Sequence, residues 1–237
     1  MKKTLFTLWL AIAAASAAHA QIGTRSSKDY DNGEGGFRAG NTGFGIKGGY
    51  NVSDLRGSGS GIFPNSKSLD AFNAGVYGQL GFNEFASLQV ELLYIRKGFR
   101  TEETTVTTGG TTTTYAARDN RLDYLELPIL FVGNVTETLS FHVGPQVSLL
   151  TKVKSADEDL DLENNGYNSL DYGAVGGVEA RLGPARLGVR YDLSLGKIYK
   201  DGTVVRYNNS ALFANGISDS NIYNQSFQVY LGLGFRK

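Results

Sequence analysis

The stretch ARLGVRYDLSLG, residues 185–196, decides how this chain folds. Every second residue from Ala185 onward is apolar, whereas the residues between them include Arg186, Arg190 and Asp192. Strict alternation of this kind predicts a β-strand with one apolar and one polar face. The apolar face would be the core of a soluble protein, but it would face lipid in a transmembrane barrel. The rest of the sequence distinguishes these two arrangements.

The same alternation recurs along the chain and predicts eight antiparallel strands. We expect them over residues 43–53, 71–82, 87–97, 123–132, 139–150, 171–182, 185–196 and 226–237. Short connections alternate with long polar ones, the long ones being near 54–70, 98–121, 152–170 and 197–224. An up-and-down meander therefore places all short turns at one end and all long loops at the other. Such a meander can close into a barrel.

Two barrels fit this pattern: a soluble, lipocalin-like ligand binder and a transmembrane barrel with a polar lumen. The polar faces favour the transmembrane barrel, because they carry charges of both signs that can pair in a narrow lumen. They are also rich in glycine, which leaves room between large lumen side chains. Strands of about ten residues span the apolar band of roughly 25 Å. We therefore predict an all-β fold, an eight-stranded antiparallel up-and-down transmembrane β-barrel.

The alternation along each strand identifies which residues face the lumen and which face the lipid and its two interfaces with water. The predicted polar network of the lumen, with a structural role, is Glu91, Glu126, Glu179, Arg181, Arg190 and Asp192. The predicted aromatic girdle at the turn end is Phe44, Phe82, Phe131, Phe141 and Phe235, and the girdle at the loop end is Tyr50, Phe72, Tyr94, Tyr172 and Phe227. Pro128 and Pro145 each remove one ladder hydrogen bond, and we expect β-bulges to accommodate them.

The N-terminus predicts export. Residues 1–20 combine Lys2 and Lys3 with an apolar run and end in AHA, which indicates a signal peptide cleaved between Ala20 and Gln21. Residues 21–42 form a polar, glycine-rich lead-in, and the barrel occupies 43–237. The 237 residues include no cysteine, which excludes disulfides and a lipoprotein anchor. A net charge of zero gives no electrostatic case for nucleic acid.

The strand motifs, taken in order, resemble the PorT-like outer-membrane β-barrel family common in Bacteroidetes. The matching segments are LQVELLYIRKG at 88–98, LDYLELPILF at 122–131, HVGPQVSLL at 142–150, DYGAVGGVEARL at 171–182 and LGVRYDLSLGKI at 187–198. The resemblance implies short periplasmic turns, long surface loops and no particular reaction, although the namesake of the family is linked to protein secretion. The closing YLGLGF, 230–235, looks like the strand read by the barrel-insertion machinery. Arg236 and Lys237 stand where the family has a final aromatic residue.

No residue pattern points to catalysis, a cofactor or a metal. His142 is the one histidine of the mature chain, and it faces the lumen near the turn end with Ser140 two residues away. A catalytic site of a small barrel would lie at the opposite rim, so we expect His142 to pack or hydrogen-bond. The acidic loop 157–163 lacks the spacing and glycine of an EF-hand. The threonine tract 104–114 has strong β-propensity and either extends the strands beyond the membrane or forms a loop.

These observations predict a non-enzymatic outer-membrane protein that is structural or acts through its surface loops, by adhesion or partner binding. One alternative is an accessory component of a secretion or envelope-assembly system, and another is the soluble ligand binder. We expect outer-membrane lipid and the insertion machinery as partners, a monomeric state and an unidentified envelope partner. A pore is disfavoured, because side chains fill the interior of an eight-stranded barrel.

Overall fold

The computed structural model describes residues 42–58, 60, 63, 66–83, 85–108, 111–156, 158–162, 164–203, 206–207, 210–211 and 221–235. The predicted signal peptide, with Ala20 and Gln21 at its cleavage site, lies outside the described residues. The predicted lead-in also lies outside them up to residue 41.

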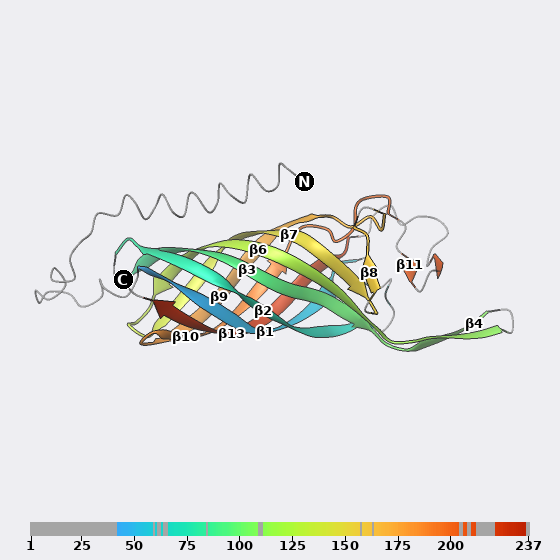
Figure 1. Ribbon diagram of the computed structural model, residues 1–237, viewed down its shortest axis with the longest axis horizontal. Coiled ribbons are helices and arrows are strands. Elements are labelled where there is room, and N and C mark those ends of the chain that lie inside the picture. Colours follow the sequence, from blue (N-terminus) through green and yellow to red (C-terminus); the bar gives the residue numbers. More distant parts are fainter. Residues whose placement is uncertain are drawn as a thin grey trace, which may run out of the picture. The chain divides into compact units, whose positions relative to one another are not determined.

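In the described part of the chain, eight long strands close into an antiparallel up-and-down barrel (Figure 1). They are β1 (Gly43–Arg56), β2 (Ser66–Gly81), β3 (Ala86–Thr101), β6 (Arg118–Asn134), β7 (Leu139–Ser155), β9 (Leu170–Leu182), β10 (Ala185–Ser194) and β13 (Tyr223–Phe235). Each strand pairs with the next, and β13 returns to β1 with Phe235 opposite Phe44. The predicted fold class is therefore confirmed.

Five short strands lie at the loop end. β4 (Thr104–Thr108) and β5 (Thr111–Tyr115) form a hairpin of their own, β8 (Glu158–Leu160) pairs with β7, and β11 (Arg206–Tyr207) pairs with β12 (Ser210–Ala211). The threonine tract thus forms the β4–β5 hairpin, which extends away from the barrel in Figure 1. The connections at the turn end are short, as predicted, and the one between β9 and β10 is Gly183 and Pro184.

The two faces of each strand are oriented as in a membrane barrel. Leu187 and Leu231 are 47% and 66% exposed on the outside, whereas Glu179 and Arg190 are 3% and 2% exposed in the lumen. The same division holds along β1, where Ile46 and Tyr50 are exposed while Lys47 and Asn51 are buried. A soluble barrel would bury the apolar set, so the exposed apolar surface requires lipid around it.

The predicted bulges at Pro128 and Pro145 are wrong. Pro128 pairs with Gln146 and Phe131 with Val143, so the β6–β7 register is constant on both sides of the prolines. Pro145 also keeps the regular β7–β9 register, opposite Ala174. The flanking pairs hold the strands in place, and the loss of single ladder hydrogen bonds does not require an extra residue.

Register shifts occur instead at the loop end. Asp123 pairs with Lys152 and Tyr124 pairs with Leu150, so Thr151 is an extra residue in β7. A second shift separates β2 and β3 between the pairs Ser68–Phe99 and Asn73–Ile95, beside Gly98 with a φ of +146°. A bulge reverses which side chains face inward. The strands continue here beyond the regular alternation, which is why β6 and β7 are longer than their sequence pattern predicts.

Aromatic side chains gather at both ends of the outer face, as predicted. At the turn end Phe44 and Phe235 contact each other, with ring centroids 5.8 Å apart. At the loop end the rings of Phe72 and Tyr94 are 6.0 Å apart. The apolar band between these rings defines the part of the barrel that spans the membrane.

The outward orientation of β13 is testable with one charge at two depths. Val229→Arg places a guanidinium near the middle of the apolar band and should lower the free energy of unfolding by ~2–4 kcal/mol. Gln225→Arg, on the same outward face near the loop-end ring, should cost ~0–1 kcal/mol. Urea titration of the protein in phosphatidylcholine vesicles measures both. Equal costs at the two positions would contradict the orientation.

Candidate functional site

The lumen is the one place where charged side chains converge in the membrane-spanning part of the described chain. The structure places all six residues of the predicted polar network there. Glu91, Glu126, Glu179, Arg190 and Asp192 are buried, and Arg181 is slightly open to solvent at the turn end. The network also includes Lys47, Lys97 and Arg186, three cations on the polar faces that were not among these six. These groups form three clusters along the lumen.

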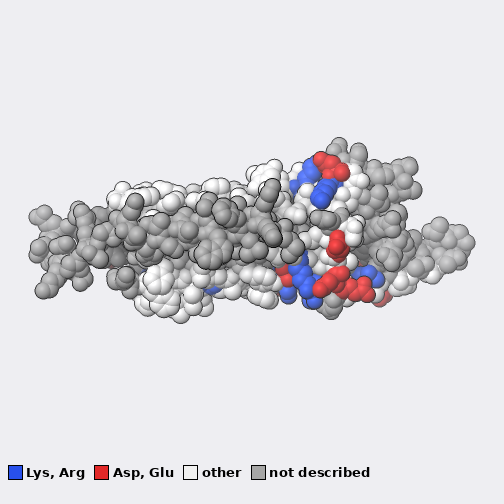
Figure 2. Space-filling view, turned by 45° about the horizontal axis from the view of Figure 1, so that its top comes forward, with Lys and Arg blue, Asp and Glu red and all other residues white. Residues whose placement is uncertain are grey.

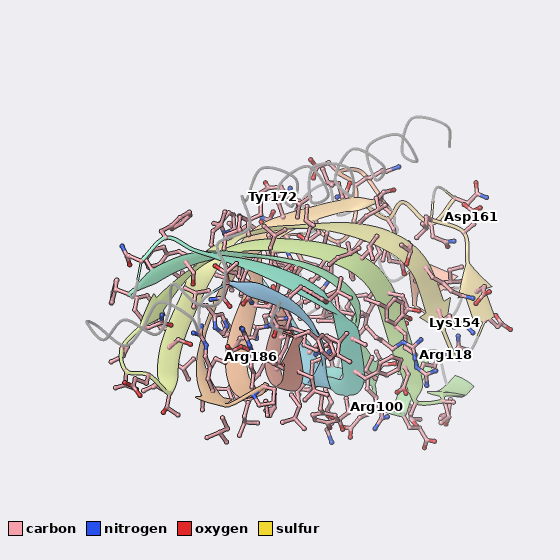
Figure 3. All side chains as sticks on the ribbon, turned by 60° about the vertical axis from the view of Figure 1, so that its left-hand side comes forward. Arg100, Arg118, Lys154, Asp161, Tyr172 and Arg186 are labelled. Carbon is pink, nitrogen blue, oxygen red and sulfur yellow. The ribbon has the colours of Figure 1, made fainter. Side chains whose placement is uncertain are left out.

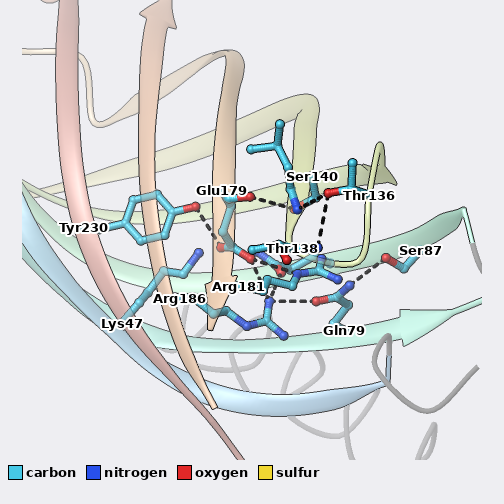
Figure 4. A network of polar contacts seen from close by, with 12 residues as sticks. Lys47, Gln79, Ser87, Thr136, Thr138, Ser140, Glu179, Arg181, Arg186 and Tyr230 are labelled. Atoms are coloured by element: carbon cyan, nitrogen blue, oxygen red, sulfur yellow. Dashed lines mark hydrogen bonds and ion pairs between the residues drawn. The ribbon is translucent and has the colours of Figure 1, made fainter. Parts of the chain in front are cut away.

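The cluster nearest the turns is centred on Glu179 (Figure 4). Its carboxylate lies 3.2 Å from Arg186 and 3.4 Å from Arg181, and it accepts a hydrogen bond of 2.9 Å from the Tyr230 hydroxyl. Arg186 also donates to the side-chain oxygen of Gln79 at 2.8 Å. Tyr230 can reach Glu179 because the neighbouring residue is Gly188, where a Cβ would lie 2.2 Å from Cζ of the ring.

The middle cluster is centred on Glu91. One carboxylate oxygen lies 2.6 Å from Nζ of Lys47 and the other lies 2.7 Å from a guanidinium nitrogen of Arg190. The ammonium of Lys47 is also 4.3 Å from the centre of the Tyr230 ring, within the range of a cation–π interaction. Two cations therefore share one carboxylate, and an aromatic face completes their environment.

The third cluster lies toward the loops and is centred on Lys97. Its ammonium is 2.5 Å from Glu126 and 2.5 Å from Asp192. Ser148 donates a hydrogen bond of 3.2 Å to Glu126, and Gln146 donates one to Asp192. Here one cation pairs with two carboxylates, whereas in each of the other two clusters one carboxylate pairs with two cations.

The lumen charge is balanced but polarised along the axis. Its buried or nearly buried cations are Lys47, Lys97, Arg181, Arg186 and Arg190, and its buried carboxylates are Glu91, Glu126, Asp171, Glu179 and Asp192. Cations predominate toward the turns and carboxylates toward the loops. Buried charges need this mutual compensation, since an unpaired ion in a narrow lumen is very costly. The ion pairs join side chains from different strands across the lumen.

His142 does not assemble a catalytic group with Ser140. The serine hydroxyl donates to the backbone oxygen of Glu179 at 3.3 Å. The imidazole is buried with its ring centroid 6.3 Å from that of Tyr230. Among the described residues there is no cluster of three or more side chains able to hold a metal ion. The predicted acidic loop is described only in part, because residues 157 and 163 lie outside the described residues.

An apolar cluster closes the lumen at the loop end, and sequence reasoning missed it. We call it the loop-end cluster; its members are Leu55, Phe63, Ile95, Phe99, Leu122, Tyr124, Leu150, Val153, Tyr167, Ile198, Tyr199 and Ile222. The rings of Phe63 and Phe99 are 4.5 Å apart, and those of Tyr167 and Tyr199 are 4.9 Å apart. The sequence signal that could have revealed this cluster is the presence of apolar residues, such as Leu55 and Ile95, at inward-facing positions near the loops.

Backbone hydrogen bonds tie the loops together over this cluster. Ile198 donates to the carbonyl of Ile222 at 2.9 Å, and Asn168 donates to the carbonyl of Ile198 at 2.9 Å. Lys200 donates to the carbonyl of Gly166 at 2.8 Å. Segments before β9, after β10 and before β13 therefore form one layer across the end of the lumen.

Burial raises the pKa of Tyr167 and raises the pKa of Tyr199 well above its ordinary value. The loop-end cluster thus requires both phenols to be neutral. A group whose folded-state pKa is raised contributes its full stability below the unfolded pKa, about 10 for tyrosine, and loses it as the pH rises through the folded pKa.

Closure of the loops should therefore weaken at strongly alkaline pH. We expect proteolytic cleavage in the loops to accelerate above about pH 10, while the heat-modifiable gel mobility of the barrel persists. Tyr199→Phe, which cannot ionise at that position, should retain protection to higher pH. Loops that stay equally protected across the titration would contradict this role of the phenols.

Removing the shared carboxylate of the middle cluster should strongly destabilise the barrel. Glu91→Gln leaves Lys47 and Arg190 facing each other and should lower the free energy of unfolding by ~3–5 kcal/mol. Adding Lys47→Met to Glu91→Gln removes one of the two cations, so the double variant should lose less than the sum of the single losses. Urea unfolding in vesicles measures the cycle, and strictly additive losses would refute the ion-pair interpretation.

Residues 20–200 of the chain match the family described as outer membrane protein beta-barrel domain. No curated protein matches the chain significantly. Within the described residues there is no helix with the length and apolarity needed to cross a bilayer.

The solved structures that are similar to the chain include three outer-membrane proteins. The Neisserial surface protein A has 15% sequence identity, with 83% of this chain and 99% of that chain covered and a TM-score of 0.46. The attachment invasion locus protein Ail of Yersinia pestis has 12% identity, coverage of 82% and 99%, and a TM-score of 0.44. The outer membrane protein OprG from Pseudomonas aeruginosa has 14% identity, coverage of 83% and 98%, and a TM-score of 0.38.

Proposed function

The chain belongs to the family of outer membrane protein beta-barrel domains, and from this premise we propose that it acts in the outer membrane through its loop-end surface, by adhesion or partner binding. The observation that carries the proposal is the closure of the lumen. Ion pairs fill its middle and the loop-end cluster covers its outer end. A filled and covered lumen supports neither a pore nor a substrate channel, so the exposed chemistry lies outside it.

The β4–β5 hairpin is the element we propose for partner contact. Its ladder runs from Thr104 opposite Tyr115 to Thr108 opposite Thr111, and no other described strand pairs with it. Both outer edges therefore present backbone donors and acceptors to the surroundings. The hydroxyls of Thr105 and Thr114 lie 3.2 Å apart on an exposed face.

Strand addition fits this element better than a side-chain pocket does. A two-stranded hairpin is only marginally stable alone in water, and a third strand would satisfy one of its free edges. Threonine, the predominant residue of this hairpin, favours the extended conformation. The hairpin thus suits an extended partner segment recognised chiefly through its backbone.

We propose that the protein is not an enzyme. The support is that His142 and Ser140 are buried, with the serine hydroxyl bonded to a backbone oxygen. In addition, four of the five lumen carboxylates are paired with cations. Outer-membrane lipid, the insertion machinery and a monomeric state remain proposals of the same kind. The exposed apolar band supports contact with lipid. The pairing of β13 with both β1 and β10 makes β13 the strand that closes the barrel within one chain, which supports a monomer and recognition of β13 by the insertion machinery.

Membership of the PorT-like branch, and with it an accessory role in secretion or envelope assembly, is a second candidate. The ordered strand motifs support the branch. The role is favoured by apolar side chains in the turns, where Phe82 is 67% and Val135 61% exposed. Such residues beyond the strand ends could contact a periplasmic partner.

Replacing the hairpin, residues 104–115, by a short glycine–serine linker separates these functions. The barrel should still fold, with unchanged heat-modifiable mobility, because the hairpin is a sheet of its own. Adhesion of intact expressing cells should fall to the level of cells without the protein. Thr105→Ala/Thr114→Ala keeps the backbone edges and should retain adhesion. Unchanged adhesion after hairpin removal, together with capture of envelope proteins that Phe82→Ser abolishes, would favour the accessory role instead.

A further inference from the structure

Three buried carboxyl groups lie in the lumen beneath the loop-end cluster, and we call this part of the barrel the loop-side chamber. They belong to Glu126 of β6, Asp171 of β9 and Asp192 of β10. Asp171 points inward, because the adjacent Tyr172 lies on the outer surface (Figure 3). The ammonium group of Lys97 interacts electrostatically with all three carboxylates. The chamber therefore combines three acidic groups with one ammonium group.

Two guanidinium groups lie near the chamber, and both have other partners. Arg190 interacts with Glu126, but it lies 2.7 Å from Glu91 in the middle cluster. Arg56 of β1 donates a hydrogen bond of 2.6 Å to the backbone oxygen of Ser194. Their partners are thus groups outside the set of three chamber carboxylates.

The other walls of the chamber carry no charge. Tyr124 of the loop-end cluster covers it, with its ring centre 5.6 Å from Nζ of Lys97. The buried side chains that β1, β2, β7 and β13 contribute at this level are amides and hydroxyls, namely Asn51, Asn73, Gln146, Ser148, Asn224 and Ser226. If all three acidic groups were ionised, the described side chains would leave the chamber with an excess of negative charge.

Hydrogen bonds distinguish Asp192 from Glu126. Both oxygens of Asp192 have donors, since one lies 2.5 Å from Nζ of Lys97 and the other accepts a hydrogen bond from the amide of Gln146. Glu126 uses a single oxygen for both of its partners, Lys97 at 2.5 Å and Ser148 at 3.2 Å. Its second oxygen, Oε2, is buried and has no donor among the described residues. The carboxylate that Lys97 compensates best is therefore that of Asp192.

Asp171 also has an oxygen without a donor. Its Oδ1 accepts a hydrogen bond of 3.1 Å from the backbone nitrogen of Gly196, whereas Oδ2 is buried with no donor in the described part of the chain. The amide oxygens of Gln146 and Asn224 are buried in the same condition. Acceptors therefore exceed donors in the chamber, and a proton on a carboxyl oxygen would add a donor.

The surplus cations of the lumen lie at its other end. Arg181 and Arg186 surround Glu179 near the turns, with side chains 12% and 9% exposed. Figure 3 shows Arg186 at the end of the barrel opposite to Arg100 and Lys154. The charges gathered near the loops in Figure 2 are on the surface, and the side chains of Arg100 and Lys154 are 51% and 30% exposed. Water reaches these groups, whereas the chamber is enclosed.

A proton fits this site better than a metal ion does. Within the described residues there is no group of three acidic or imidazole side chains able to hold a metal ion. Calcium and magnesium would also require a shell of oxygen ligands or water around the ion. A proton needs no such space, and a buried carboxylate without its own cation becomes neutral by taking one up.

We propose that the loop-side chamber binds two protons, one on Glu126 and one on Asp171, and that both carboxyl groups are neutral in the folded protein at neutral pH. Asp192 remains the anion paired with Lys97. Unfolding exposes both groups to water, where they ionise above about pH 5. The barrel is therefore more stable in mild acid, and it loses this stability as the pH rises and the protons leave. The site goes beyond the proposed role of the hairpin and does not depend on it.

The test is urea unfolding of the full-length mature protein in phosphatidylcholine vesicles from about pH 5.5 to about pH 7, where unfolded carboxyl groups are ionised. The variants Asp171→Asn and Glu126→Gln carry neutral side chains of the same shape. Folding of the wild type takes up one more proton than folding of either variant. The ratio of the wild-type unfolding constant to that of each variant should therefore rise about tenfold per pH unit, and about a hundredfold for the double variant. His142 is present throughout, so its titration cancels in these ratios.

Asp123→Asn is the matched control. Asp123 is also buried, but it is paired with Arg96 at 2.7 Å, so it is ionised in both states and its ratio should stay constant over this range. Infrared spectra supply a second readout, because a protonated carboxyl group has a C=O stretching band that a carboxylate lacks. The wild type should show this band at pH 7, and Asp171→Asn and Glu126→Gln should each reduce it.

The wild-type spectrum decides the matter even if the variants do not refold. A ratio independent of pH for either chamber variant, or a wild-type spectrum at pH 7 without the protonated band, would overturn the proposal. Wild-type stability at pH 7 that falls on removal of divalent cations with EDTA, together with constant ratios, would assign the chamber to a metal ion instead.

Discussion

The structure depends on one constraint: charges shut into a narrow lumen surrounded by lipid must compensate one another. Glu91 between Lys47 and Arg190, and Lys97 between Glu126 and Asp192, are the clearest examples. Water at the periphery cannot screen these groups, so each ion is stable only in the presence of its partner. The strands that carry them are thereby held in one register, and the barrel is filled as well as closed.

This constraint also directs where the protein can act. A lumen occupied by ion pairs has little freedom to bind or move a substrate. The loop-end cluster adds an apolar layer, with Tyr167 and Tyr199 joining segments that precede and follow the strands. The accessible groups are then the backbone edges of the β4–β5 hairpin and the charged side chains above the aromatic girdle. Membership of the family of outer membrane protein beta-barrel domains places the chain in the outer membrane. We propose that it acts there through these exposed groups.

The loop end combines features that the membrane-spanning part excludes. Register shifts and a hairpin that pairs with no other described strand occur at or beyond the girdle formed by residues such as Phe72 and Tyr94. Inside the lipid a free strand edge or an unpaired charge is too costly, whereas water tolerates both. The boundary between a regular barrel and a variable surface therefore coincides with the edge of the hydrocarbon layer.

The sequence by itself determined the strands, their faces and the alternation of short turns with long loops. Period-two patterning is a local property, so residues 185–196 by themselves place Leu187 and Arg190 on opposite faces. The charges of both signs and the glycines on the polar faces of the other strands then indicated that Leu187 faces outward. Tertiary structure alone decided which charges meet, because Lys47 and Glu91 come from strands that are brought together by barrel closure. It also decided the extra residue at Thr151 and the regular register at Pro128, since both depend on how two strands align. The loop-end cluster was hidden for the same reason: Leu55, Phe99 and Tyr199 become one apolar layer only when distant segments converge on the end of the lumen.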